Sequence, residues 1–361
     1  MDAETSTLAG SSTPGPEANK TVLSAFRIVL VCLFIPSTVI TVLGNALVLA
    51  AYKRDERIRK RRTNTFILNL AIADLLVGIT MIIYIPQYIT DKWLFGRTFC
   101  IIVWAISYIS TDMSVITVIA ISVDRYLMVR NAMKYQLRQS RKRIVLIFIV
   151  VWFFCSLVHT SLAFIYSAWN DYNYLKYQTC NLEYRREKAL FFSMFIFEFV
   201  LPVLTLFLLN LKVFIKIQKQ KETIIELKGR RGEDTNANVV PGRDGKNDQE
   251  KTSGLPVMRV HRTPTPGGGH QKAAKLLTIL LLVFILCWLP HYINECYVLI
   301  HGGEANNVAT EAMTFILWAN SAINPILYAC ANVHYRENFL YFLHIGKKRL
   351  YGNRRPMNVH V

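Results

Sequence analysis

The chain has 361 residues, a formal net charge of +18 at pH 7, a hydrophobic content of 52% and a charged content of only 18%. Together with a positive mean hydropathy, this composition excludes an ordinary soluble domain of the same length and is typical of a membrane protein. In a membrane protein the basic charge follows from topology and from attraction to an anionic inner leaflet, so we expect membrane lipid but no nucleic acid as a partner.

The amino-terminal segment 1–23 is polar and has neither a basic start nor an apolar stretch, so it does not read as a cleavable signal peptide. We expect an extracellular tail, with the first apolar segment serving as the anchor. The triplet Asn19-Lys20-Thr21 is a glycosylation sequon, which makes Asn19 a candidate glycosylation site on this tail.

Seven long apolar segments follow, and each is close to or longer than the ~20 residues that cross a bilayer as a helix. They cover approximately 24–52, 64–90, 98–123, 144–165, 189–215, 272–300 and 308–331. The stretch IVLIFIVVWFFCSLV (144–158) is apolar at nearly every position, whereas a membrane barrel strand alternates apolar and polar residues. The sequence therefore predicts an all-α membrane protein, with a seven-transmembrane helix bundle over 24–331.

The basic residues predict the orientation of this bundle. Segment 52–62 reads YKRDERIRKRR and segment 125–143 holds a second group of cations, whereas segment 90–97, on the opposite side, has few. Because cytoplasmic loops are enriched in lysine and arginine, we expect an extracellular amino terminus and a multi-pass protein of the plasma membrane. The polar, glycine-rich segment 218–270 is expected to be a disordered third cytoplasmic loop.

Two of the seven cysteines lie on the predicted outer side. Cys100 stands at the start of the third segment and Cys180 in the following outer loop, where the environment is oxidising, so we expect a disulfide between them. The other five lie in or near the apolar segments and are expected to be small buried residues.

Polar side chains inside the apolar segments are the main functional candidates, because they are costly in a bilayer and usually face the bundle interior. They are Asn45, Asp74, Asp112, Ser114, Glu198, His291, Asn294, Glu295, Asn320, Ser321 and Asn324.

Several of these residues belong to short motifs that occur in order on successive segments. The motifs are LGNALV (43–48), LNLAIADLL (68–76), DRY (124–126), CWLP (287–290) and NPILY (324–328). With them the chain resembles a rhodopsin-like (class A) G-protein-coupled receptor, from the first segment to an amphipathic helix at RENFLYFLH (336–344), within the cytoplasmic tail segment 332–361. Within this class it is similar in its sequence features to biogenic amine receptors, especially histamine-type ones.

The resemblance implies a sodium pocket and a transmission path. Sodium, a possible allosteric ligand and the only cofactor-like group implied, would be held by Asp74, Ser114, Asn320 and Ser321; the alternative is a purely structural polar cluster. The resemblance assigns activation and G-protein coupling to Asp124, Arg125, Tyr126, Pro290, Asn324, Pro325 and Tyr328. Arg125 would pair with Asp124 at rest, and Pro290 would be a hinge.

Two departures from the family pattern affect the resting state. The acid that pairs with the DRY arginine in many relatives stands twenty residues before the proline of CWLP, where this chain has His270. The usual tyrosine eight residues after Pro202 is Asn210. Both departures lead us to expect basal activity.

A third departure concerns the ligand. Amine receptors of this family carry their ammonium-binding aspartate eighteen residues before the DRY arginine, where this chain has Ser107. Asp112 lies about one and a half turns deeper. Glu198, four residues before Pro202, is where histamine-type receptors use a glutamate for the imidazole.

Asp112 and Glu198 allow two interpretations. They could bind a protonated amine or imidazole that Glu295 and Glu183 attract at the rim of the pocket. Alternatively, they could form a hydrogen-bonded acid pair that only holds two helices together. Four aromatic residues could wall such a pocket, or simply pack: Tyr108, Trp288, Tyr292 and Trp318.

The predicted function is thus that of a receptor that binds a small, cationic extracellular ligand and activates a heterotrimeric G protein. An inhibitory-type G protein is favoured, and arrestin is expected as a further partner. A peptide or lipid receptor of the same fold is the alternative. A transporter would need inverted repeats or a charged pore, and the sequence shows neither. An enzyme would need a nucleophile elbow, a phosphate loop or a metal-ligand cluster, and the sequence shows none of these.

Overall fold

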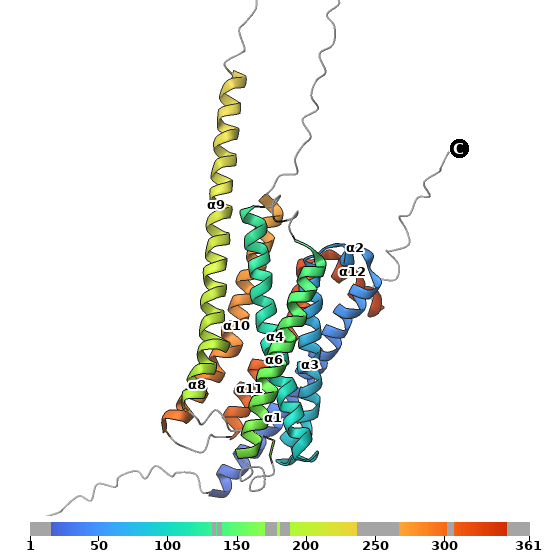
Figure 1. Ribbon diagram of the computed structural model, residues 1–361, viewed down its shortest axis with the longest axis vertical. Coiled ribbons are helices and arrows are strands. Elements are labelled where there is room, and N and C mark those ends of the chain that lie inside the picture. The colour runs from blue at the N-terminus through green and yellow to red at the C-terminus, as the bar shows by residue number, and fades with distance from the viewer. Residues whose placement is uncertain are drawn as a thin grey trace, which may run out of the picture.

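Long helices run side by side through the computed structural model (Figure 1), which describes residues 16–131, 135, 139–169, 179–180, 188–236, 267–301 and 307–344. The side chains of some helix ends, including those of Asn19 and His270, lie outside this description. The long helices are α1 (Pro16–Arg54), α3 (Asn64–Thr90), α4 (Arg97–Arg130), α6 (Arg141–Trp169), the continuous α8 (Lys188–Met194), η2 (Phe195–Val200) and α9 (Leu201–Asn236), then α10 (Gly267–His301) and α11 (Asn307–Ala331). Two short helices, α2 (Glu56–Lys60) and α12 (Val333–Phe342), follow α1 and α11.

Six of these helical stretches are long and apolar enough to cross a membrane: Phe26–Arg54, Asn64–Thr90, Arg97–Arg130, Arg141–Ile165, Lys188–Gln220 and Lys275–His301. The seventh helix, α11, packs against α1 and α10 but is less apolar. It carries Glu311, Asn320, Ser321 and Asn324. Glu311 bonds to Arg27 of α1, and Ser321 and Asn324 bond to Asp74 of α3. With α11 packed in this way against the bundle of the other six helices, the predicted seven-helix bundle is confirmed.

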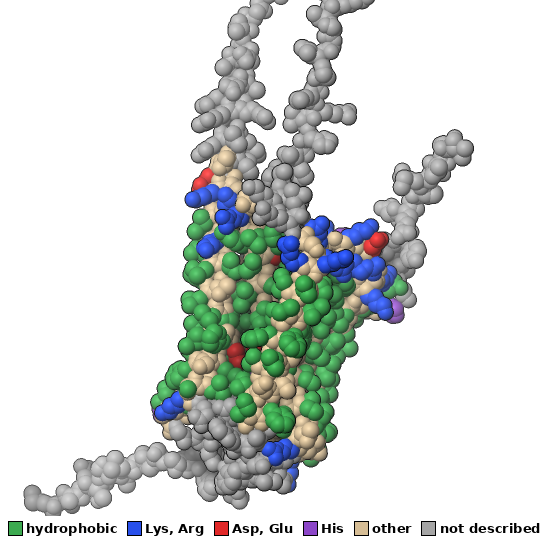
Figure 2. All heavy atoms as spheres, viewed as in Figure 1, with side chains coloured by type: hydrophobic (Ala, Val, Ile, Leu, Met, Phe, Trp, Pro, Cys, Tyr) green, Lys and Arg blue, Asp and Glu red, His purple; other side chains and the backbone are tan. Residues whose placement is uncertain are grey.

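The bundle is apolar outside as well as inside. On α6 the buried residues Ile144, Phe148, Cys155 and Ala163 recur at helical spacing, whereas Phe153 and Phe164 are each 71% exposed. Figure 2 shows the apolar side chains that cover the face it draws, with most Lys and Arg gathered at the end that holds α2 and α12 and along the upper part of α9. An apolar exterior of this kind is stable only against lipid.

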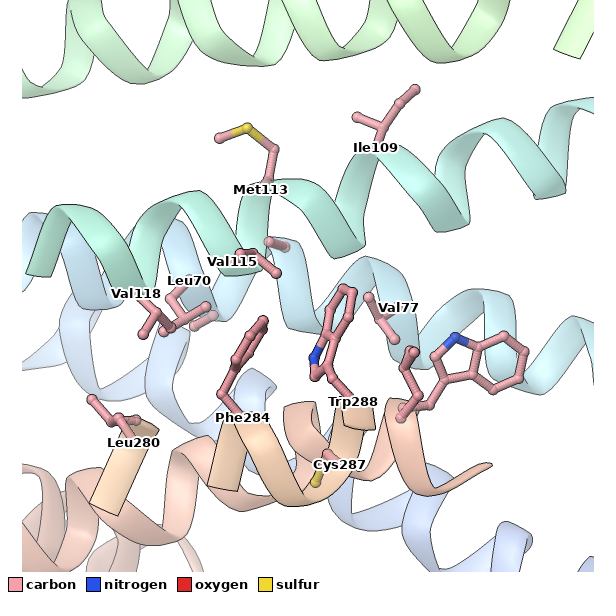
Figure 3. Packing of buried hydrophobic residues seen from close by; sticks show 14 of the residues in the cluster. Leu70, Val77, Ile109, Met113, Val115, Val118, Leu280, Phe284, Cys287 and Trp288 are labelled. Carbon is pink, nitrogen blue, oxygen red and sulfur yellow. The ribbon is translucent and has the colours of Figure 1, made fainter. Parts of the chain in front are cut away.

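The core between α4 and α10 is built from interlocking apolar side chains. Figure 3 shows Phe284 and Trp288 of α10 pointing toward α4, where Val115 and Val118 lie. Elsewhere helices approach very closely: a Cβ at Gly78 of α3 would lie 2.7 Å from Cγ2 of Val42 on α1. Only glycine fits this contact without a shift of the neighbouring helix.

Two boundaries differ from the sequence prediction. α1 begins at Pro16, inside the segment 1–23 expected to be an extracellular tail before the first helix, and proline is favoured at the first position of a helix. α9 continues to Asn236 and α10 starts at Gly267, so both ends of the loop expected to be disordered over 218–270 are helical. The sequence QKQKETIIELK (218–228) consists largely of good helix formers. Residues 237–266 lie outside the described part.

The amphipathic helix predicted over 336–344 is α12. The Asn332 side chain caps it by accepting a hydrogen bond of 3.0 Å from the backbone N–H of His334. Tyr335 and Asn338 are buried against the bundle, whereas Leu340 and Leu343 are exposed.

A π-helical turn, η2, interrupts the helix formed by α8 and α9. Pro202 has no N–H to donate to the carbonyl of Glu198 four residues before it, and the N–H of Leu201 bonds instead to the carbonyl of Ile196, five residues back. Such single π turns are frequent at functional sites, and this one carries Glu198.

Candidate functional site

The outer end of the bundle is tied together by the predicted disulfide. Cys100 of α4 is bonded to Cys180, with their Cα atoms 5.5 Å apart, which confirms the expectation. The backbone N–H of Cys180 donates to Oε1 of Gln87 on α3 at 2.6 Å. The bridge thus fixes the segment around Cys180 over the ends of α3 and α4. Glu183, the expected rim acid of the same segment, lies outside the described residues.

Asp112 of α4 is held by a histidine on α6. Its Oδ2 lies 2.6 Å from Nε2 of His159, and the two side chains are 22% and 4% exposed. An ionised carboxylate can only accept hydrogen bonds, so the imidazole is the donor in this contact. The acid that sequence reasoning placed near Glu198 therefore has a hydrogen-bond partner on a different helix.

Glu198 of η2 has its own partner on α10. The hydroxyl of Tyr292 donates to Oε2 of Glu198 at 2.8 Å. Figure 2 shows acidic side-chain atoms within the apolar surface that it draws. Asp112 and Glu198 thus each have a hydrogen-bond partner on another helix, Asp112 on α6 and Glu198 on α10.

The aromatic residues expected to wall the pocket divide into two groups. The ring of Tyr108 lies 5.8 Å from the ring of His159, the partner of Asp112, and Trp288 stacks at 6.2 Å with Tyr292, the partner of Glu198. Trp318 instead packs against Tyr84 and Phe34, at 5.7 and 5.8 Å. This second group fills the space between α1, α3 and α11.

Within the described part of the chain, the two remaining ligand-binding candidates are not seen in a hydrogen bond or ion pair with Asp112 or Glu198. Ser107 is buried, and its carbonyl accepts a hydrogen bond of 2.7 Å from the hydroxyl of Thr111. Glu295, expected at the rim, is half-buried near the outer end of α10.

Asp74 of α3 is fully buried at the centre of a second polar cluster. Its Oδ1 accepts hydrogen bonds from Ser114 at 2.9 Å and from Ser321 at 2.8 Å, and its Oδ2 accepts one from Asn324 at 2.8 Å. Asn320, expected in this cluster, is buried beside it but makes no hydrogen bond with Asp74 in the described part, and Asn324 takes that place. One carboxylate with two hydroxyl oxygens is a donor set that suits sodium, a hard cation.

The DRY sequence lies at the opposite end of α4. The Asp124 carboxylate accepts hydrogen bonds from Tyr135 at 2.7 Å and Gln139 at 3.0 Å, and Nε of Arg125 lies 3.9 Å from its second oxygen. Burial and the Asp124 charge raise the pKa of Tyr135. Arg125 and Asp124 are thus adjacent, as expected, but the loop residues make the shorter contacts.

The other activation candidates lie on α4, α10 and α11. The Lys212 ammonium lies 6.0 Å from the ring centre of Tyr126, and buried Tyr328 of α11 lies 6.2 Å from the ring of Tyr335 on α12. Pro290 and Pro325 stand inside α10 and α11. Proline inside a helix removes a backbone hydrogen bond, so each is a point where its helix can bend.

Comparison with known proteins agrees with this architecture. Residues 44–328 match the family described as 7 transmembrane receptor (rhodopsin family). This match covers most of the chain, and the chain therefore belongs to the rhodopsin family of seven-transmembrane receptors. It is a receptor, not an enzyme.

The chain is similar to several receptors for small amines. It is 28% identical over 353 residues to the D(5)-like dopamine receptor of Takifugu rubripes, covering 94% of this chain and 71% of that receptor. It is 26% identical over 327 residues to the human histamine H2 receptor, covering 88% and 79%, and 27% identical over 350 residues to human 5-hydroxytryptamine receptor 4, covering 92% and 83%.

Sequence reasoning missed His159. The polar residues singled out in the apolar segments were acids, amides, two serines and His291, and His159 inside VVWFFCSLVHTSL (150–162) was not among them. The signal was present, because His159 is the only acidic or basic residue between 144 and 165, and it lies seven residues after Trp152 on the buried face of α6.

Proposed function

We propose that this receptor binds a small extracellular cation, amine- or imidazole-like, and activates a heterotrimeric G protein. The observation that carries the proposal is the pair of acids Asp112 and Glu198 within the apolar bundle, bordered by the rings of Tyr108, Trp288 and Tyr292. Acids in a bilayer are retained mainly for function, and aromatic faces favour cations.

The site differs from that of an ordinary amine receptor, since Ser107 stands at the position of the usual ammonium-binding aspartate. The proposed anchor for the ligand is therefore Glu198, with Tyr292 orienting its carboxylate at 2.8 Å. The amine receptors to which the chain is 26–28% identical support a small cationic ligand as the class.

The proposed orientation has the amino terminus outside the plasma membrane and α2, α12 and the carboxyl-terminal end of α9 in the cytoplasm. The exposed cations Lys53, Arg57, Lys60 and Arg61 around α2 support it, since basic residues are retained on the cytoplasmic side. The G protein would bind at this end, where Arg125 lies. An inhibitory-type G protein and arrestin are the partners we propose.

A ligand panel tests the function. Cells that express the chain are exposed to amines, imidazoles, short peptides and lipids, and dissociation sensors for each class of G protein report activation. We expect cations to activate an inhibitory G protein in wild type, and Glu222→Gln, an exposed change on α9, to leave potency unchanged. Activation by neutral lipids or peptides alone would replace the proposed ligand class, and silence of all sensors would contradict G-protein coupling.

A further inference from the structure

His159 is an unusual residue for its position on α6. The buried face of this helix consists otherwise of small or apolar residues such as Phe148, Cys155 and Ala163, and the opposite face is exposed to lipid. A histidine that is 4% exposed on such a helix needs a polar partner, because an unpaired polar ring in a bilayer is destabilising.

The ring has one such partner, Asp112. The contact of 2.6 Å between Nε2 and Oδ2 has the length of a charge-assisted hydrogen bond. The second ring nitrogen, Nδ1, is buried and has no hydrogen-bond partner among the described residues. The imidazole is therefore anchored in the bundle through the Asp112 carboxylate alone.

The location of His159 also matters. Its ring lies 2.6 Å from Asp112, and the Tyr108 ring stands 5.8 Å from its own ring. An acid and an aromatic face are the surroundings in which an external amine or imidazole would be held. The chain places its own imidazole there.

We propose that His159 occupies the cation-binding position of Asp112, as an internal imidazole in place of an external one. Asp112 is then compensated within the protein, and Glu198 is the acid that meets the ligand. The bundle offers a ligand one acidic group instead of two, which selects ligands with a single positive charge over dications. His159 is thus a specificity-determining residue that acts through Asp112.

Removal of the imidazole should open a site that free imidazole can fill. The experiment uses the purified full-length chain in detergent and measures its melting temperature with and without imidazole. We expect His159→Ala to lower the melting temperature and added imidazole to restore at least half of the loss, with half-saturation on the order of 1–10 mM for a ligand of this size. Wild type, whose site is already filled, should show no such saturable shift.

Two controls separate a cation site from a space that any ring can fill. Pyrazole has the shape of imidazole but stays neutral at pH 7, and it should restore much less. The double variant His159→Ala with Asp112→Asn, which retains the space and removes the acid, should not respond to imidazole. Equal stabilisation by pyrazole, an imidazole effect that survives in the double variant, or no effect in His159→Ala would each overturn the proposal.

If His159→Ala folds too poorly to purify, its surface expression in cells grown with or without imidazole measures the same rescue. Expression that imidazole fails to raise would contradict the proposal, as would a rise of the same size in the double variant. The choice of Glu198 as the ligand's acid rests on the proposed function, but the melting experiment needs neither agonist nor G protein. Its failure would leave the proposed function standing, and a silent ligand panel would leave this pairing intact.

Discussion

The side-chain amide of Asn338 on α12 donates a hydrogen bond of 3.0 Å to Oδ2 of Asp55, the residue that caps α2. Asn338 also accepts a hydrogen bond of 2.9 Å from Arg54, whose guanidinium lies 3.4 Å above the ring of Tyr341. The turn after α1 and the helix after α11 are thus joined side chain to side chain, although they are separated by 283 positions in the sequence.

Replacement of Asp55 with Asn should loosen this junction. Hydrogen bonds from the Arg57 guanidinium hold the pKa of Asp55 well below its usual range. Burial acts in the opposite direction, and the hydrogen bond from Asn338 adds to the effect of Arg57. We expect Asp55→Asn to lower the melting temperature by about 2–5 °C, the shift that a loss of about 1–2 kcal/mol produces. Glu56→Gln, an exposed neighbour, should have little effect.

The same residue predicts a pH dependence. Because the folded-state pKa of Asp55 is lower than the unfolded value of about 4, its contribution is complete above that value and declines as pH falls toward the folded pKa. The difference in melting temperature between wild type and Asp55→Asn should therefore be constant from about pH 5 to 8 and shrink only in stronger acid. A difference that vanishes already at pH 6 would contradict this assignment.

Asp74 predicts a specific effect of sodium. The melting temperature should be higher in sodium chloride than in choline chloride at equal ionic strength, because sodium would bind to the folded state alone. Asp74→Asn should abolish this difference, since an amide does not supply the charge that compensates the lost hydration of the ion. If wild type does not distinguish the two salts, the Asp74 cluster is a structural one.

Cys100→Ser and Cys180→Ser should each reduce surface expression or ligand binding strongly. The bridge links positions 80 residues apart and fixes the outer segment to α3 and α4, and loss of such a disulfide destabilises by about 2–5 kcal/mol. Cys32→Ser is the matched control, because Cys32 is exposed on α1 and is not in a disulfide. Normal potency and surface level in both bridge variants would show that the disulfide is dispensable.

Glu198→Gln should reduce the potency of the most active cation in the panel by at least tenfold at unchanged surface expression. Removal of one charge of a buried pair costs about 2–5 kcal/mol when the partner remains buried. Asp112→Asn should act chiefly on thermal stability, since its partner is His159. A larger potency loss in Asp112→Asn than in Glu198→Gln would reverse the roles given to these two acids.

His270 predicts ligand-independent signalling that rises with receptor density. A histidine at this position cannot supply the acid that restrains the DRY arginine in many relatives, so the resting state should lack that restraint. His270→Glu should lower the basal signal severalfold, with His301→Glu at the outer end of α10 as a control that leaves it unchanged. A wild-type receptor that is silent at high expression would refute this expectation.

Most of the architecture could be predicted, because long apolar segments and in-order motifs are properties of the local sequence. The boundaries at Pro16 and Asn236 could not, since polar residues with high helix propensity are compatible with either a loop or an extended helix. Cys100 and Cys180 were paired correctly because only these two cysteines share the outer side.

The polar contacts were harder to predict, because they depend on which helix faces which. The family resemblance placed Asp112 near Glu198, but the hydrogen-bond partner of Asp112 follows from the packing of α6 against α4. Likewise Asn324, assigned to transmission, lies beside Asp74, because one turn of α11 brings Ser321 and Asn324 to the same face.

The direction in which Glu198 points depends on the number of residues in the π turn at Phe195–Val200. One extra residue in a turn rotates everything on its outer side by about 100° relative to a regular helix. If the turn relaxed to regular geometry, α8 would rotate by that amount about its axis while α9 stayed in place, and Glu198 would turn away from Tyr292. The orientation of Glu198 toward Tyr292 therefore depends on the π turn that carries it.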